Sequence, residues 1–188
     1  MWACAFCGLA LDLWGGLWYN IYGEMHLVLH SCSLGLMILR IYLDNCCYNR
    51  PYDDQSQLRI SLESQAKVYI QNMIRNDELE LATSFVLTFE NSKNRVEEKR
   101  NAIASFMEEY SSIYISGTCK DRADTIASEI MATGVKSADA LHTACAIIAR
   151  CDYMLTTDDR LLKYRSDKIR IVNPTEFIMI IGGIDNDR

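Results

Sequence analysis

The feature that most constrains the fold is an alternation, from Met37 onward, of short apolar runs with longer stretches of helical periodicity. The short runs have the length and the β-branched composition of strands. Five strands are predicted: Met37–Leu43, Glu78–Ala82, Ser112–Ile115, Tyr153–Thr156 and Lys168–Val172.

The stretches between these strands carry apolar residues at helical spacing. The predicted helices are Gln55–Arg75, Phe85–Glu90, Arg95–Tyr110, Asp121–Thr133, Ala138–Arg150 and Asp159–Tyr164. A further helix begins at Asn173, its cap, and Pro174, its first residue. Strands separated by helices predict an α/β fold with a parallel sheet covered on both faces.

The first 36 residues differ from the rest of the chain. They contain none of the 19 basic residues and all three tryptophans. A secretory signal needs a basic region, and a membrane span needs about 20 nearly unbroken apolar residues, whereas Asp12 and Glu24 interrupt this segment. We therefore interpret residues 1–36 as an extension that is non-native or poorly ordered, and residues 37–188 as the folded domain. A weak membrane anchor is the alternative interpretation of residues 1–36.

The same segment contains the ligand types of a zinc finger. Cys4 and Cys7 are followed by His26 and His30, and such closely spaced pairs bind Zn²⁺ in zinc fingers. The pairs are eighteen residues apart here, whereas about twelve is usual, and no basic helix accompanies them. We interpret the pattern as a chance pairing.

The charge and the cysteine content exclude some classes of protein. Nineteen Lys and Arg against 25 Asp and Glu give a net charge of −6, which argues against binding of nucleic acid by bulk positive charge. A local contact to a phosphate through a metal ion is still compatible with this net charge. Eight cysteines in 188 residues are too few for a disulfide scaffold. They predict reduced thiols in a cytoplasmic protein.

Acidic residues follow several of the predicted strands. Asp44 closes the first strand, Glu90 lies on the helix after the second, Asp139 is in the first turn of a long helix, and Asp158 follows the fourth strand with Asp159 beside it. In open parallel sheets, ligands bind outside the carboxyl ends of the strands. Clustered carboxylates need a cation or bound protons between them, and oxygen ligands favour Mg²⁺ or Mn²⁺. The pattern predicts metal-assisted cleavage of phosphoesters, although each acid alone also fits a turn, a cap or solvated surface.

At this point the sequence resembles the PIN-domain nucleases, over residues 37–180. The resemblance is carried by five stretches in order: Ile41–Asn45, Thr83–Glu90, Ser137–Ala146, Leu155–Leu161 and Asn173–Phe177. It implies a three-layer α/β/α domain with a central, mostly parallel sheet.

The resemblance also implies a site and an activity. Asp44, Glu90, Asp139 and Asp158 would hold one or two Mg²⁺ or Mn²⁺ ions, with Asp159 as an alternative to Asp158. It implies a metal-dependent endoribonuclease acting on single-stranded or structured RNA, such as the VapC-type toxins, with an antitoxin or a second copy as possible partners and no membrane. The 45 residues between Asp44 and Glu90 are long for a compact toxin.

The expected mechanism is hydrolysis by a metal-activated water that Glu90 orients or deprotonates. Asn45 and Thr156 occupy positions where the family often has a polar residue beside the site. Arg50 and Arg160 are candidate phosphate contacts, although ordinary surface charge explains them equally well. A catalytically inactive PIN-like module that binds RNA or protein is the alternative, and a phosphotransfer receiver domain fits less well, since Asp44 has no acidic neighbour.

Overall fold

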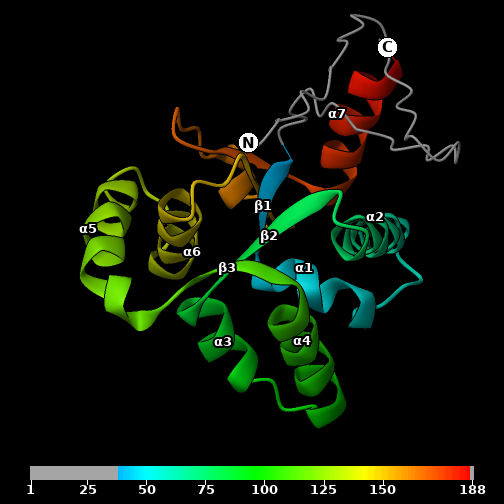
Figure 1. Ribbon diagram of the computed structural model, residues 1–188, viewed down its shortest axis with the longest axis horizontal. Coiled ribbons are helices and arrows are strands. Elements are labelled where there is room, and N and C mark those ends of the chain that lie inside the picture. The colour runs from blue at the N-terminus through cyan, green and yellow to red at the C-terminus, as the bar shows by residue number, and fades with distance from the viewer. Residues whose placement is uncertain (1–37, 187–188) are drawn as a thin grey trace, which may run out of the picture. The chain divides into compact units, whose positions relative to one another are not determined.

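A computed structural model describes residues 38–186, and its five strands form one parallel sheet (Figure 1). The strands are β1 (Leu39–Leu43), β2 (Leu79–Ser84), β3 (Ser111–Ile115), β4 (Tyr153–Leu155) and β5 (Arg170–Val172). Their order in the sheet is β3-β2-β1-β4-β5, and every neighbouring pair is parallel. Because β1 lies at the centre between β2 and β4, the carboxyl ends of these three strands are adjacent.

Helices cover both faces of the sheet. They are α1 (Asn45–Asn49), α2 (Leu58–Arg75), α3 (Phe85–Ser92), α4 (Glu97–Tyr110), α5 (Lys120–Met131), α6 (Ser137–Ile148) and α7 (Pro174–Asn186), with short 3₁₀ turns η1 (Arg50–Tyr52), η2 (Gly117–Cys119) and η3 (Leu161–Lys163). The helix α5 packs against α6, and α2 packs against α7. Figure 1 shows α5 and α6 on one side of the sheet and α2 on the other. The predicted α/β/α architecture is confirmed.

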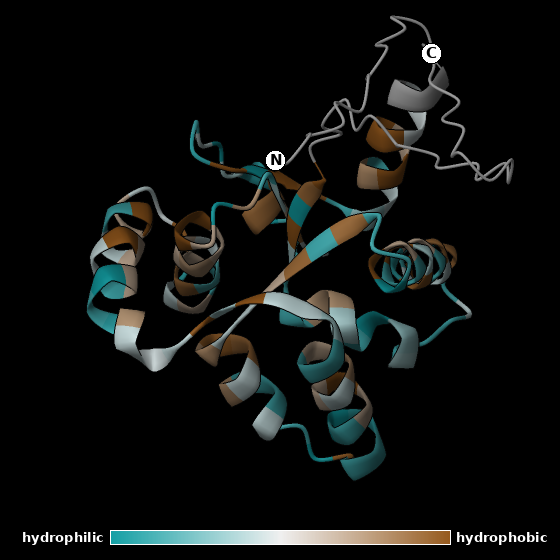
Figure 2. Ribbon diagram, viewed as in Figure 1, coloured by the Kyte–Doolittle hydropathy of each residue, from teal (hydrophilic) through white to brown (hydrophobic). Residues whose placement is uncertain are grey.

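The core follows from this layering. A strand with helices on both faces must bury both sets of alternating side chains, and Ile41, Tyr42 and Leu43 of β1 are all completely buried. The helices alternate hydrophobic and hydrophilic residues along their length, whereas the central strands are largely hydrophobic (Figure 2). The polar side chains of Tyr42, on β1, and His142, on α6, are buried in this core as well.

Several predicted segments have other bounds in the structure; α2, for example, begins at Leu58 instead of Gln55. The segment after Asp44, for which no helix is predicted, forms α1 and η1, because the Asp44 side chain accepts a hydrogen bond from the first helical amide and Tyr48 is buried. The predicted helix Asp159–Tyr164 contains only the turn η3. The last strand begins at Arg170, two residues later than expected.

Several expectations fall on residues that the structure does not describe. The proposed boundary between residues 1–36 and 37–188 stays a prediction, and the Cys4, Cys7, His26 and His30 pattern lies outside the described residues. Within residues 38–186, no helix is both long and apolar enough to cross a membrane. The five cysteines in that range are all free thiols.

Candidate functional site

Asp44 lies at the carboxyl end of the central strand, and its carboxylate is held on both oxygens. Oδ1 accepts a hydrogen bond of 2.7 Å from the Asn45 amide. Oδ2 accepts one of 2.8 Å from the Thr156 hydroxyl and one of 3.0 Å from the Cys46 thiol. The Thr156 hydroxyl in turn accepts a hydrogen bond of 3.1 Å from the Asp158 amide. Thr156 therefore connects the end of β1 with the segment that follows β4.

Glu90, on α3, joins this edge through a buried histidine of α6. His142 Nε2 lies 3.0 Å from Glu90 Oε2 and 3.9 Å from Asp44 Oδ1. The hydrogen bond from His142 lowers the pKa of Glu90, burial opposes this effect, and a hydrogen bond from the Asn45 side chain adds to the lowering. Asn45, predicted to lie beside the site, thus contacts Glu90 with its side chain and Asp44 with its amide.

The other face of the His142 ring is also bonded. Its Nδ1 lies 2.8 Å from the Tyr42 hydroxyl, which lies 2.7 Å from the Ser84 hydroxyl. Burial alone would lower the pKa of His142, but the hydrogen bond to Glu90 and the negative charge of Asp44 outweigh it and raise the pKa. The link that His142 makes between Glu90 and Tyr42 joins positions far apart along the chain.

Asp139 lies in the first turn of α6, one helical turn before His142. Burial raises the pKa of its carboxyl group, and the negative charges of Asp44 and Asp158 raise it further, while His142 and Arg160 partly offset them. Asp44, Asp139 and Asp158, from three separate segments, are therefore close enough to repel one another. We call Asp44, Glu90, Asp139 and Asp158 the acidic cluster.

The adjacent Asp158 and Asp159 have different surroundings. The Asp158 carboxylate accepts hydrogen bonds from the Arg160 amide at 2.8 Å and the Arg160 guanidinium at 2.9 Å, which lower its pKa to about 2. The Asp159 carboxylate is paired with Arg59 of α2 at 2.6 and 2.9 Å. Asp158 is the one whose charge is felt at Asp139, whereas the Asp159 carboxylate is engaged on α2.

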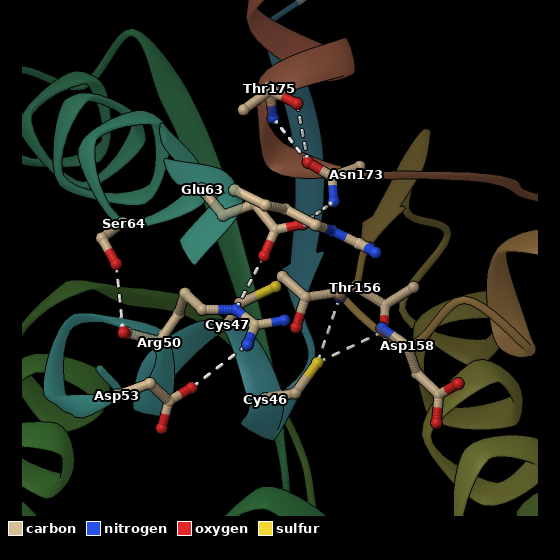
Figure 3. A network of polar contacts seen from close by, with 12 residues as sticks. Cys46, Cys47, Arg50, Asp53, Glu63, Ser64, Thr156, Asp158, Asn173 and Thr175 are labelled. Carbon is tan, nitrogen blue, oxygen red and sulfur yellow. Dashed lines mark hydrogen bonds and ion pairs between the residues drawn. The ribbon is translucent and has the colours of Figure 1, made fainter. Parts of the chain in front are cut away.

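Arg50, a candidate phosphate contact, belongs to a network of polar contacts that includes Asp53, Glu63 and Ser64 (Figure 3). Its Nε lies 2.8 Å from Oε2 of Glu63, a residue that is only 2% exposed. Glu63 Oε1 also accepts hydrogen bonds from Arg59 at 2.9 Å and Asn173 at 2.7 Å. Asn173 caps α7, as predicted, by accepting a hydrogen bond from the Thr175 amide. The sequence held no signal for this role of Glu63, which is one of several polar residues on α2.

The acidic cluster has the chemistry of a site for a hard divalent cation. Its donors are carboxylate oxygens, joined by the Thr156 hydroxyl, and such donors suit Mg²⁺ and Mn²⁺. Burial and the negative charges of Asp44 and Asp158 raise the pKa of Asp139, and His142 and Arg160 offset this only in part, so a cation would relieve the remaining repulsion. No three His, Cys, Asp or Glu side chains between residues 38 and 186 already stand in a geometry that could hold a metal ion.

The described residues form a five-stranded parallel sheet with helices on both faces. Asp44 directly follows β1, and Glu90 lies on α3. Asp139 lies in the first turn of α6, and Asp158 lies in the segment after β4. All four are at the carboxyl edge of the parallel sheet. This is the class of architecture that the resemblance implies.

Comparison with known proteins gives likenesses of structure only. No protein-family model and no curated protein matches the sequence. Similar solved structures include VapBC2 from Rickettsia felis bound to a DNA fragment from its promoter, with 15% identity and a TM-score of 0.46, covering 72% of this chain and 98% of that chain. FitAcB from Neisseria gonorrhoeae has 16% identity and a TM-score of 0.44, covering 71% and 97%. FitAB bound to an IR36 DNA fragment has 18% identity and a TM-score of 0.46, covering 72% and 95%.

Proposed function

We propose that this chain is a metal-dependent endoribonuclease that hydrolyses phosphodiester bonds in single-stranded RNA. The observation that carries the proposal is geometric: Thr156 and His142 join Asp44, Glu90 and the segment of Asp158 at the carboxyl edge of the sheet, where ligands of parallel sheets bind. Asp139 lies one helical turn before His142, and its pKa is raised by burial and by the charges of Asp44 and Asp158. Glu63 differs, because Arg50, Arg59 and Asn173 contact its carboxylate.

In this proposal Asp44, Asp139 and Asp158 hold Mg²⁺ or Mn²⁺, directly or through water. The bound ion supplies an activated water and stabilises negative charge on the phosphate. Thr156 and the Asn45 amide fix the orientation of the Asp44 carboxylate. Asp159 is the weaker candidate ligand, since its oxygens are engaged by Arg59.

Glu90 would orient or deprotonate the attacking water. The lowered pKa of Glu90 keeps its carboxylate ionised, so that it can accept a hydrogen bond from that water. His142 Nε2 lies 3.0 Å from Glu90 Oε2 and would fix the orientation of the Glu90 carboxylate. The expected products are a 5′-phosphate and a 3′-hydroxyl.

We propose further that the protein is a cytoplasmic toxin of a toxin–antitoxin pair, with an antitoxin and a second copy as possible partners. The support is the resemblance of its motifs to VapC-type toxins. The alternative, an inactive PIN-like module that binds RNA or protein, is favoured by the engagement of Asp158 with Arg160, which occupies one member of the acidic cluster.

The experiment is cleavage of a labelled single-stranded RNA by the purified chain with Mg²⁺, with Mn²⁺ and with excess EDTA. We expect cleavage with either metal, none with EDTA, and none by Asp44→Asn. The matched control is Asp77→Asn, because Asp77 is exposed at the turn before β2 and has a φ of 58°, which asparagine tolerates. Cleavage that survives EDTA, or is unchanged in Asp44→Asn, would refute the proposed site.

A further inference from the structure

The surface beside the acidic cluster contains two hollows with opposite charge balance. The first, which we call the basic hollow, has a volume of about 400 Å³ and is lined in part by Lys136, Asp139, Arg160, Lys163 and Arg165. It carries four cationic groups against a single carboxylate. The second, the acidic hollow, has a volume of about 520 Å³. Its charged lining residues are Arg50, Asp53, Asp158, Asp159 and Arg160.

The cations of the acidic hollow are already paired. Arg50 contacts Asp53 at 3.2 Å and the buried Glu63 at 2.8 Å. Arg160 contacts Asp158 at 2.9 Å. Asp159 is likewise paired with Arg59, so the acidic hollow has no uncommitted cation to offer a polyanion.

The cations of the basic hollow are mostly uncommitted. Lys136 and Lys163 are exposed and make no ion pair with another of residues 38–186. The Arg165 guanidinium donates hydrogen bonds to the backbone carbonyls of Leu162 and Tyr164, so its positive charge has no acidic partner there. In a chain with a net charge of −6, this is a local concentration of positive charge.

The fold fixes the two lysines close to Asp139. The turn between α5 and α6 depends on Gly134, which has a φ of 96° and can adopt it without strain. That turn leads directly to Lys136 and then to Asp139 in the first turn of α6. Lys163 reaches the same hollow from η3.

We propose that the basic hollow binds the backbone phosphate of the nucleotide next to the cleaved bond, with Lys136 and Lys163 as its principal contacts. The proposal rests on the proposed function, because it adds where the RNA lies relative to the acidic cluster. It also gives the substrate a direction: the strand leaves the site over α6 and η3, and avoids the acidic hollow. An acidic protein binds a polyanion in this way through one local patch.

The test is binding and cleavage of a labelled single-stranded oligoribonucleotide by Lys136→Ala/Lys163→Ala. The matched control is Lys120→Ala/Arg122→Ala, which removes the same charge from exposed positions at the opposite end of α5. Binding is measured by fluorescence anisotropy in the Asp44→Asn background, so that the RNA stays intact. Thermal unfolding of each variant checks that the fold is retained.

Each phosphate contact to a single strand contributes about 0.7 to the slope of log K against log salt. The lysine variant should lose about 1.4 of this slope and bind about 25-fold more weakly at 0.1 M salt, while the control is unchanged. In the active protein KM should rise with little change in kcat, because uniform binding is lost.

The outcomes separate this inference from the proposed function. RNA cleavage with binding and KM unaltered in the lysine variant would overturn the phosphate site alone. No cleavage by the unmodified chain, together with weakened binding in the lysine variant, would overturn the nuclease and support the phosphate site. An Asp44→Asn protein that binds no RNA would overturn the phosphate site.

Discussion

Glu63 and Asp139 are two carboxylates withdrawn from solvent in different ways. Glu63 is 2% exposed, and its oxygens receive Arg50, Arg59 and Asn173 within 2.9 Å. The Asp139 carboxylate receives no hydrogen bond or ion pair from any other residue between 38 and 186, and its neighbours Asp44 and Asp158 carry the same charge. The same fold therefore pairs both oxygens of the Glu63 carboxylate with donors and leaves the Asp139 carboxylate beside two groups of the same charge.

The difference separates a carboxylate that the fold pairs from one that it leaves beside like charges. A partly buried charge without partners costs free energy. Glu63 joins η1, α2 and the start of α7. In the proposed function, a bound cation would supply the partner that Asp139 lacks among the described residues.

The largest expected effect is on activity and concerns Asp139. Loss of a residue that only supports a metal ligand costs about 10- to 100-fold in activity. Asp139→Asn should reduce RNA cleavage by more than this, because it removes a proposed direct contact to the ion. Initial rates with Mg²⁺ measure it, with Asp77→Asn as the control. Cleavage within a few-fold of the original chain would remove the contrast with Glu63.

The next effect is on stability and concerns Glu63. Glu63→Ala should lower the free energy of unfolding by about 3 kcal/mol, the lower part of the range for breaking a buried pair, since Arg50 keeps Asp53 and Arg59 keeps Asp159. Urea unfolding measures it, and Glu109→Ala, at an exposed position of α4, serves as the control. Equal midpoints for the two variants would mean that the Glu63 network is not structural.

The pH dependence of stability tests the like charges around Asp139. The folded-state pKa of Asp139 is raised above its unfolded value, so the stability that its protonated form confers is fully present below the unfolded pKa and is lost as pH rises through the folded pKa. In EDTA, Asp139→Asn should therefore melt at a higher temperature than the original chain at pH 7, and the difference should shrink toward pH 3. An asparagine variant that is less stable at pH 7 would contradict the assigned repulsion.

The smallest effect concerns the neighbouring Asp158 and Asp159. Asp159→Asn breaks an exposed ion pair with Arg59 and should hardly change the melting temperature, because solvent screens such pairs, while cleavage continues. Asp158→Asn should strongly reduce cleavage, because its charge is the one felt at Asp139. Parallel measurements of melting temperature and cleavage rate decide between them, and the reverse ranking of rates would make Asp159 the ligand.

Local patterns predicted what local forces decide. Periodicity gave the five parallel strands, and the end of each strand marked Asp44 and Asp158. The helix α1 was missed because its N-cap is Asp44 itself, a residue interpreted only as a ligand. The Glu63 network and the link from His142 to Tyr42 join residues 110 and 100 positions apart, and such pairings depend on the assembled fold.

The hydrogen bond from Thr156 to Asp44 spans 112 positions of the chain, and this spacing has a consequence during synthesis. A polypeptide still growing on the ribosome cannot add β4 beside β1 until it has been extended past Leu155. Parallel pairings over such separations also form late, because a long loop must close before they give any stabilisation. A nascent copy of this chain would thus lack the assembled acidic cluster until β4 has been synthesised and has paired with β1.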